Sequence, residues 1–186
     1  RVLFRSHVEL VVNDYLIQEL CYNEPLEGRF NTFAVEGATA GMCYIFDSLI
    51  ANNILSKGDK IALMSPIFTP YLEIPHLPRY NFEVINICAD EMDEEGRHTW
   101  QYPESEIDKL KDASIKALFV VNPNNPPSVA MRPQSVRQLK HVVENFNPDL
   151  MIISDDVYST FVDNFSSIMA DLPYNTIGVY SYSKYF

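Results

Sequence analysis

The amino-acid sequence predicts an α/β protein with a mostly parallel sheet and helices on both faces of that sheet. Apolar segments of strand length alternate with segments of helical periodicity along the chain, an order typical of parallel sheets. The strand-like segments of the second half are almost continuously apolar, as strands are when both of their faces are buried. The sequence contains no internal repeat and no low-complexity segment that would indicate another class.

The first half of the chain opens with an expected amphipathic helix. Apolar residues recur every three or four positions from Val8 to Leu20, and the residues at 23–28 should end that helix. From there the expected elements are a strand at 30–35, a helix at about 40–55, a buried strand at 60–64, a proline-rich stretch around Pro70, Pro75 and Pro78, a strand at 82–87 and an acidic solvated loop at 90–96.

The second half alternates more clearly between the two kinds of element. Pro103 should start a short helix, because proline suits a first helical position and carboxylates follow in the first turn. The expected elements are a helix at 103–110, a strand at 116–121, a loop at 122–128, a helix from Pro133 with Val136, Leu139, Val142, Val143 and Phe146 on its inner face, a strand at 150–153 and a strand at 176–180.

Composition and charge exclude several classes of function. The 186 residues are 47% hydrophobic, which is enough for one domain with a sizeable core. The 14 basic residues against 25 acidic ones give a net charge of −11, which argues against a nucleic-acid partner. No apolar run approaches the roughly 18 residues needed to span a bilayer, so we expect a soluble protein with no membrane partner.

The cysteines and histidines are scattered along the chain. Three widely spaced cysteines (Cys21, Cys43 and Cys88) form no C-x-x-C pair and suit a reducing compartment, so we expect a cytoplasmic protein. The four histidines show no metal-ligand spacing, and we expect no metal site.

Polar residues follow the last three expected strands at the point where each strand ends. Asn125 follows the first of them, Asp155 and Tyr158 follow the second, and Lys184 follows the third. Ligand sites in open α/β sheets lie beyond the carboxyl ends of the strands. The small residues at 37–39 precede a helix and offer backbone N–H groups to a phosphate. An enzyme that uses pyridoxal 5'-phosphate (PLP) needs this set of groups: an amide, a carboxylate, a phenol, an amine and a phosphate-binding site.

Three motifs carry a resemblance to a known family. In order and spacing they resemble the successive signatures of the fold-type I aminotransferases, the aspartate aminotransferase family, and three ordered motifs are more specific than one. The motifs are Asn122-Pro123-Asn124-Asn125-Pro126, Asp155-Asp156-Val157-Tyr158 and Ser181-Tyr182-Ser183-Lys184.

A closer resemblance, over nearly the whole chain, is to the bacterial aspartate 4-decarboxylase branch of this family, whose members are bifunctional. It rests on the segments Phe33 to Ala40, Pro66 to Pro75 and His98 to Pro103. This resemblance implies the three-layer large domain of fold-type I PLP enzymes over residues 1–186. It also implies that an N-terminal segment, the small C-terminal domain and the main substrate-carboxylate arginine lie outside the chain.

The resemblance implies a role for each candidate site residue. Lys184 is implied to bond covalently to PLP and to shuttle protons, which makes it the catalytic residue. Asp155 is implied to pair with the pyridine nitrogen. Asp156 competes for that role, but the D-x-x-Y spacing to Tyr158 selects Asp155 and leaves Asp156 as a helix cap. The other implied cofactor contacts are Tyr158 and Asn125 on the ring oxygen, Phe68 on the ring face, and Gly37, Ala38, Thr39 and Ser181, with Ser183 nearby, on the phosphate.

Structural explanations remain open beside these roles, and the chain departs from the family pattern at one point. Phe68 could be a core residue, Asn125 a turn residue, and Lys184 a surface lysine. Pro127 and Ser128 stand where many aminotransferases have Thr-Gly, and Pro127 removes a backbone donor and fixes φ. We therefore expect this loop to hydrogen-bond differently from the usual one.

The function implied by the resemblance is PLP-dependent β-decarboxylation of L-aspartate to L-alanine and CO2, with aspartate transaminase activity. One alternative is an aspartate or broad-specificity aminotransferase without decarboxylase activity. Another is a non-catalytic relative with the PLP fold that regulates or scaffolds. The resemblance also implies a homo-oligomer, a dimer or larger, with an amino acid as its small-molecule partner.

Overall fold

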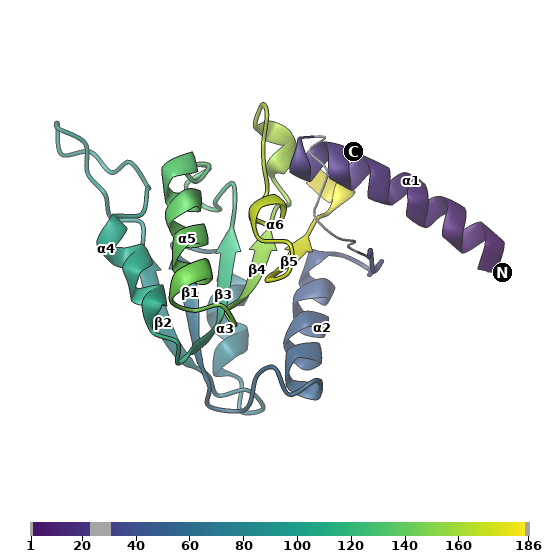
Figure 1. Cartoon of the computed structure of the whole chain (residues 1–186), viewed down its shortest axis with the longest axis horizontal. Coiled ribbons are helices and arrows are strands. Elements are labelled where there is room, and N and C mark those ends of the chain that lie inside the picture. Colours follow the sequence, from purple (N-terminus) through teal and green to yellow (C-terminus); the bar gives the residue numbers. More distant parts are fainter. Residues whose placement is uncertain (1, 23–30, 185–186) are drawn as a thin grey trace.

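Five parallel strands form one sheet in the computed structural model of the chain, which describes residues 2–22 and 31–184 (Figure 1). The order across the sheet is β2-β1-β3-β4-β5, and each neighbouring pair is parallel. The α/β prediction with a parallel sheet is confirmed. The strands are β1 (Lys60–Ser65), β2 (Glu83–Cys88), β3 (Ile115–Val121), β4 (Met151–Asp155) and β5 (Thr176–Val179).

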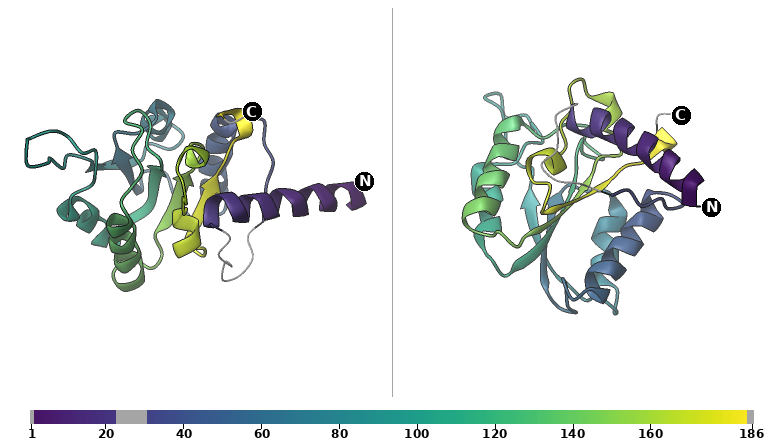
Figure 2. Two further views of the ribbon diagram at one scale, coloured as in Figure 1. Left: turned by 90° about the horizontal axis from the view of Figure 1, so that it is seen from above. Right: turned by 45° about the vertical axis from the view of Figure 1, so that its right-hand side comes forward.

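Helices cover both faces of the sheet (Figure 2). Alternate strand residues belong to the cores on the two sides. Phe119 of β3 belongs to the core beneath α2 and α3, while Leu118 belongs to the core beneath α4, α5 and α6. This alternation matters for the site, because it sends consecutive residues of β4 to opposite faces. The covering helices are α2 (Ala38–Ala51), α3 (Thr69–Glu73), α4 (Glu104–Ile107), α5 (Pro133–Asn145) and α6 (Ile168–Asp171), with 3-10 turns η1 (Ile74–His76), η2 (Asp108–Lys111), η3 (Ser159–Phe161) and η4 (Tyr182–Lys184).

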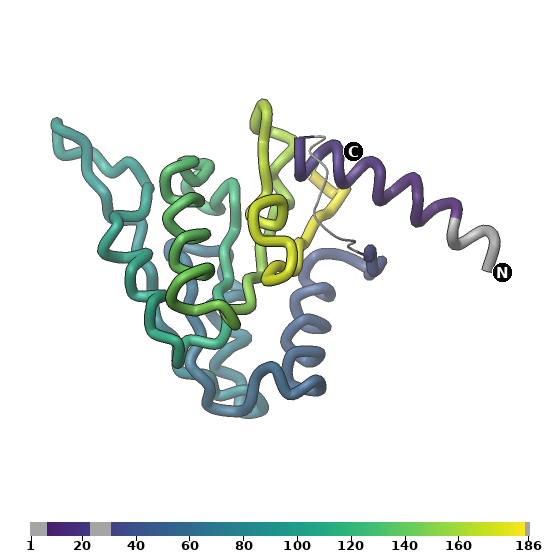
Figure 3. Tube along the Cα trace, viewed as in Figure 1, coloured from purple at the N-terminus to yellow at the C-terminus, as the bar shows by residue number. Residues whose placement is uncertain are grey.

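The first helix, α1 (Val2–Cys21), packs on the rest of the molecule through its C-terminal half, where Leu16, Leu20 and Cys21 join a core cluster. The Tyr15 hydroxyl lies 2.8 Å from the Tyr180 hydroxyl, and the Leu20 carbonyl accepts a 2.6 Å hydrogen bond from the Ser167 N–H. The part of the helix before this contact that Figure 3 draws in colour projects away from the sheet. Val8, which begins the predicted apolar stripe, is 56% exposed there.

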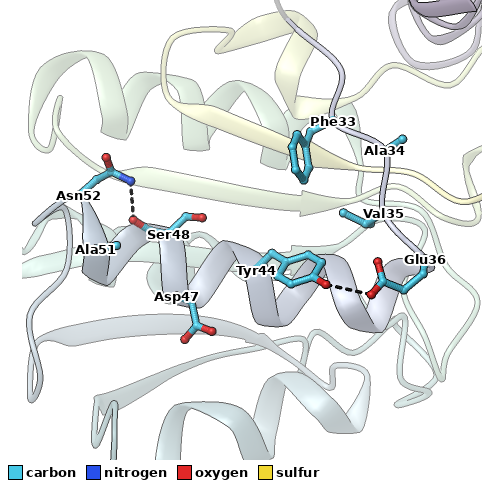
Figure 4. Close-up of a pocket in the computed structure, with 9 residues that line it drawn as sticks. All are labelled: Phe33, Ala34, Val35, Glu36, Tyr44, Asp47, Ser48, Ala51 and Asn52. Atoms are coloured by element: carbon cyan, nitrogen blue, oxygen red, sulfur yellow. Dashed lines mark hydrogen bonds between the residues drawn. The ribbon is translucent and has the colours of Figure 1, made fainter. Parts of the chain in front are cut away.

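The strand predicted at 30–35 is wrong where the structure describes it. Residues 31–35 have no regular secondary structure, and Phe33 is 79% exposed. The segment pairs with none of the strands in the described part of the chain, and it runs over α2 instead (Figure 4). Residue 30 and the predicted break at 23–28 lie outside the described residues.

Two helix details also differ from the sequence prediction. Helix α2 ends at Ala51 rather than Leu55, and Asn53 adopts a left-handed φ of 57° that a helix cannot contain. Phe146 lies just past the end of α5 and is 46% exposed, so it is not on the inner face. The Lys111 ammonium covers its ring at 5.0 Å from the centroid. Among the helices described, none combines the length and hydrophobicity needed to cross a membrane.

Candidate active site

The last three strands of the sheet end side by side at one edge. Val121, Asp155 and Val179 are register partners across β3, β4 and β5. The Asn122 N–H donates to the Asp155 carbonyl over 2.9 Å, and the Asp156 N–H donates to the Val179 carbonyl over 2.8 Å. Strand β4 ends two residues later than predicted, so Asp155 is its last residue. The chain segments that follow all three strands therefore emerge together.

Asp155 points to the α2–α3 face of the sheet and is 4% exposed. Its Oδ2 accepts a 2.9 Å hydrogen bond from the Tyr71 hydroxyl, and its Oδ1 accepts one of 3.2 Å from the Val157 N–H. Burial raises the pKa of the Asp155 carboxyl, and these two hydrogen bonds oppose that rise. Among residues 7–22 and 31–184, no cationic side chain forms an ion pair with it. A buried carboxylate in this situation would be stabilised by a cation from outside the chain.

Lys184 and Tyr158 meet beyond the ends of β4 and β5. The Lys184 ammonium nitrogen lies over the Tyr158 ring at 5.9 Å from its centroid, and the Lys184 side chain is exposed. Tyr158 follows Asp155 by three residues, so the acid, the phenol and the amine gather at one edge of the sheet. In the same segment the Ser181 and Ser183 hydroxyls are 2.9 Å apart.

The predicted phosphate seat lies at the start of α2. Gly37 is the N-cap residue, with φ 133° and ψ 161°, and residues with a side chain rarely adopt this backbone conformation. Ala38 packs partly against the core, while Gly37 and Thr39 are exposed. The helix begins at the edge where β3, β4 and β5 end (Figure 1). Its first N–H groups have no acceptor within the helix and can bind an anion.

Phe68 and Asn125 occupy two other loops. Phe68 is the N-cap residue of α3 and packs partly against the core. Asn125 is half-buried in the loop between β3 and α5. Among the described residues, two pairs of predicted site residues are in polar or ring contact: Tyr158 with Lys184, and Ser181 with Ser183. Neither Phe68 nor Asn125 makes such a contact with another predicted site residue in this part of the chain.

The loop around Asn125 is held by hydrogen bonds of two other asparagines, Asn122 and Asn124. The Asn122 side-chain oxygen accepts a 2.9 Å hydrogen bond from the Met131 N–H, and the Asn124 amide donates to the Tyr102 hydroxyl over 3.2 Å. The Ser128 N–H donates to the Asn124 carbonyl over 2.9 Å. The residue after Pro127 thus supplies a backbone donor within this unusual loop.

Asp156 is not a helix cap, contrary to the sequence prediction. It is fully buried on the α6 side, where it accepts hydrogen bonds from the hydroxyls of Ser154 (2.8 Å) and Ser167 (2.6 Å). The cap of α6 is Ser167, whose side-chain oxygen accepts from the Met169 N–H. Burial raises the pKa of Asp156 to about 8. The two adjacent acids therefore have different hydrogen-bond partners on opposite faces of the sheet.

The Asp156→Asn variant should lose part of the pH dependence of stability. The folded state keeps a proton on Asp156 up to about pH 8, whereas the unfolded chain releases it near its ordinary pKa. The raised pKa of Asp156 therefore adds to the free energy of unfolding. This stabilisation is complete below pH ~4 and is lost as the pH rises toward 8. Thermal unfolding at pH 5 and pH 8 should show a smaller decrease for Asp156→Asn than for the wild type. Equal decreases would contradict the assignment.

The Asp156→Ala variant is the control for packing in that experiment. It leaves two buried serine hydroxyls without their acceptor. We expect it to lower the free energy of unfolding by about 1–3 kcal/mol at both pH values.

Sequence reasoning missed Tyr71 and Gln101 as supports of the site. Gln101 is buried and joins two segments, since its side chain donates to the Ala130 carbonyl (3.0 Å) and accepts from the Arg132 N–H (3.0 Å). Both hydrogen-bond partners of Gln101 are distant in sequence, and no local sequence pattern predicts them. For Tyr71 the one available signal was its place three residues after Phe68 in the proline-rich stretch.

A pocket of about 450 Å³ lies apart from the predicted site residues, between residues 33–36 and the outer side of α2 (Figure 4). The Tyr44 hydroxyl donates to the Glu36 carboxylate across one end of it, over 2.9 Å. None of the predicted site residues lines this pocket. In the described part of the chain, no three metal-binding side chains are grouped to hold an ion.

The parallel sheet, with an acid, a phenol and an amine at its carboxyl edge, is the arrangement of a known family. The sequence profile of aminotransferase class I and II matches residues 35–186, and the chain belongs to this family. It is 46% identical over 178 residues to a bifunctional aspartate aminotransferase and L-aspartate beta-decarboxylase from Pseudomonas sp.. It is 28% identical over 127 residues to an aspartate aminotransferase from Thermotoga maritima.

The chain is shorter than these relatives. The two alignments cover 96% and 67% of this chain but 33% and 31% of the relatives, so the chain spans about a third of their length.

Solved structures share the fold. A PLP-bound putative aminotransferase from Clostridium difficile matches with a TM-score of 0.71 at 19% identity over 96% of this chain and 43% of its own. Cystalysin from Treponema denticola matches with a TM-score of 0.68 at 18% identity over 95% of this chain and 42% of its own.

Proposed function

We propose that residues 1–186 form most of the PLP-binding large domain of an enzyme that removes the β-carboxylate of L-aspartate as CO2 and yields L-alanine. Aspartate transaminase activity accompanies this reaction. Family membership and the 46% identity to a protein named for both activities support the proposal. The observation that carries it is the buried Asp155 carboxylate, which has no cationic partner in the described chain and ends the strand next to the one that leads to Lys184.

The residues at the strand ends fit PLP. Asp155 offers a negative charge to a protonated pyridine nitrogen, and its bonds to Tyr71 and Val157 keep that charge in place. Asn125 and Tyr158 supply an amide and a phenol for the ring oxygen. Phe68 supplies an aromatic face for the ring. The N–H groups at the start of α2, Thr39, Ser181 and Ser183 supply donors for the phosphate.

Lys184 provides the catalytic amine. PLP, when bound, supplies an electron sink that stabilises negative charge at the substrate α carbon. Lys184 takes the proton from that carbon and later returns it, and its exposed side chain leaves it free to reach a ligand. In the net reaction the bond between the β carbon and its carboxylate breaks, CO2 leaves, and a proton takes its place at the β carbon.

The test is incubation of the full-length natural protein with PLP and L-aspartate in the absence of any keto acid. We expect alanine and CO2 in equal amounts, because decarboxylation needs no amino-group acceptor. The Thermotoga maritima relative favours a second candidate, an aspartate aminotransferase without decarboxylase activity. Turnover that requires a keto acid and releases no CO2 would favour that candidate and contradict decarboxylation.

We further propose a homo-oligomer, a dimer or larger, that works in the cytoplasm. Exposed apolar side chains support an interface between copies: Val8, Leu10 and Val11 on α1 and Phe33 before α2 are each more than half exposed. The described cysteines, Cys21, Cys43 and Cys88, are all free thiols, which suits a reducing compartment.

A further inference from the structure

Tyr71 and Asp155 form a buried hydrogen-bonded pair beneath the candidate site. The two residues are 84 positions apart in sequence, and the phenol donates to the carboxylate over 2.9 Å. Tyr71 is 1% exposed and Asp155 is 4% exposed. A hydrogen bond to an ionised group is strong away from water, and its loss leaves the charge unsatisfied. Asp155 is therefore held by α3 as well as by its own strand.

The same short helix also carries Phe68. The Phe68 carbonyl accepts a 2.9 Å hydrogen bond from the Tyr71 N–H, so the two residues are fixed relative to each other. The Tyr71 ring packs against the Phe119 ring of β3, with the centroids 5.8 Å apart. Tyr71 thus connects the acid expected at the ring nitrogen with the aromatic side chain expected on the ring face.

We infer that Tyr71 is a positioning residue, whose hydroxyl holds the Asp155 carboxylate charged and in a fixed orientation for a protonated pyridine nitrogen. The inference deepens the proposed function and rests on it. Tyr71 acts through Asp155 and does not itself touch the substrate.

The charges around this pair agree with the inference. The titratable groups against Asp155 are Tyr71 from α3 and Asp156 from the next position, with Tyr158 and Lys184 beyond the strand ends. Burial and the Asp155 charge raise the pKa of Tyr71 well above its ordinary value, so its hydroxyl stays a donor. Burial raises the pKa of Asp156 to about 8, so below that pH it adds no charge beside Asp155. Strands β3 and β5 face Asp155 with valine register partners.

The Tyr71→Phe variant removes the hydroxyl and keeps the ring. We would measure the PLP dissociation constant against pH in the full-length protein. The bond lowers the pKa of Asp155, so its removal raises that pKa, and the carboxylate needed by PLP persists only at higher pH. We expect the acidic midpoint of PLP binding to move upward by about 1–2 pH units.

Two controls separate positioning from general packing. Tyr80→Phe removes another phenol that is 1% exposed and donates to an aspartate, but that aspartate, Asp47, is on the exposed side of α2. It should leave the PLP midpoint unchanged. In the Asp155→Asn background, Tyr71→Phe should change PLP affinity less than about 2-fold, because no titrating carboxylate remains for it to act on.

The outcomes separate the inference from the function on which it rests. If the wild type fails to bind PLP, both are overturned. If the wild type binds PLP and Tyr71→Phe binds it with an unshifted midpoint, or if Tyr80→Phe produces the same shift, only the inference is overturned. If Tyr71→Phe does not fold, difluorotyrosine at position 71 replaces it. Its more acidic phenol should move the midpoint downward, and an unmoved midpoint overturns the inference.

Discussion

Replacing Lys184 with alanine should abolish covalent attachment of PLP and lower kcat for L-aspartate by about 10⁴-fold, the upper end of the effect of one general acid–base group. Lys184 is the only described residue that brings an amine to the Tyr158 ring at the ends of β4 and β5. The variant should fold normally, because the Lys184 side chain is exposed and makes no ion pair among the described residues. Its effect should therefore be chemical.

The measurement has a covalent readout in addition to activity. Borohydride reduction of the full-length protein loaded with PLP should add the cofactor mass to the wild-type chain and none to Lys184→Ala. Lys57→Ala is the matched control, since Lys57 is also exposed but lies in the turn before β1, at the opposite edge of the sheet. Retained cofactor mass in Lys184→Ala would overturn the assignment of the covalent lysine.

The same experiment bears on the alternative of a non-catalytic relative. A regulator or scaffold with this fold would have no need of a lysine that bonds to PLP. Wild-type protein that gains no cofactor mass and turns over no aspartate would favour that alternative. Wild-type protein that does both would exclude it.

The sheet and the residues at its edge were predictable because they depend on local sequence and on one rule of topology. Apart from the exposed Lys116, strand β3 is apolar and buried, as is typical of a strand covered on both faces. Parallel strands bring their carboxyl ends to one edge, so Asp155 at the end of β4 and Lys184 after β5 were expected to lie near each other. The segment at 31–35 also contains apolar residues, but it pairs with none of the five strands that the structure describes, and sequence composition carries no information on partners.

The supporting contacts were not predictable, because they depend on partners distant in sequence. Asp156 directly after a strand resembles a local cap, whereas its observed partner Ser167 lies 11 positions further on, under α6. Tyr71 finds Asp155 from 84 positions away, and nothing in the proline-rich stretch around it indicates a carboxylate. Local patterns thus located the groups proposed for chemistry, and only the packed structure identified the groups that hold them.

Asp155→Ala should retain some PLP but reduce turnover by about 10²–10³-fold or more, the loss typical of removing one preorganised electrostatic partner. The start of α2 and Lys184 remain in this variant, so two of the proposed attachments of the cofactor are kept. The variant removes the proposed partner of a protonated pyridine nitrogen from the end of β4, so we expect negative charge at the substrate α carbon to be less well stabilised.

Two further variants identify the charge as the cause. Asp155→Asn keeps the shape of the side chain and should be nearly as inactive as Asp155→Ala, because the charge is what both variants lose. Asp156→Asn changes the neighbouring acid, which is bonded to Ser154 and Ser167 on the other face, and should keep most of the turnover. Full activity in Asp155→Asn, or a greater loss in Asp156→Asn, would transfer the cofactor role from Asp155 to its neighbour.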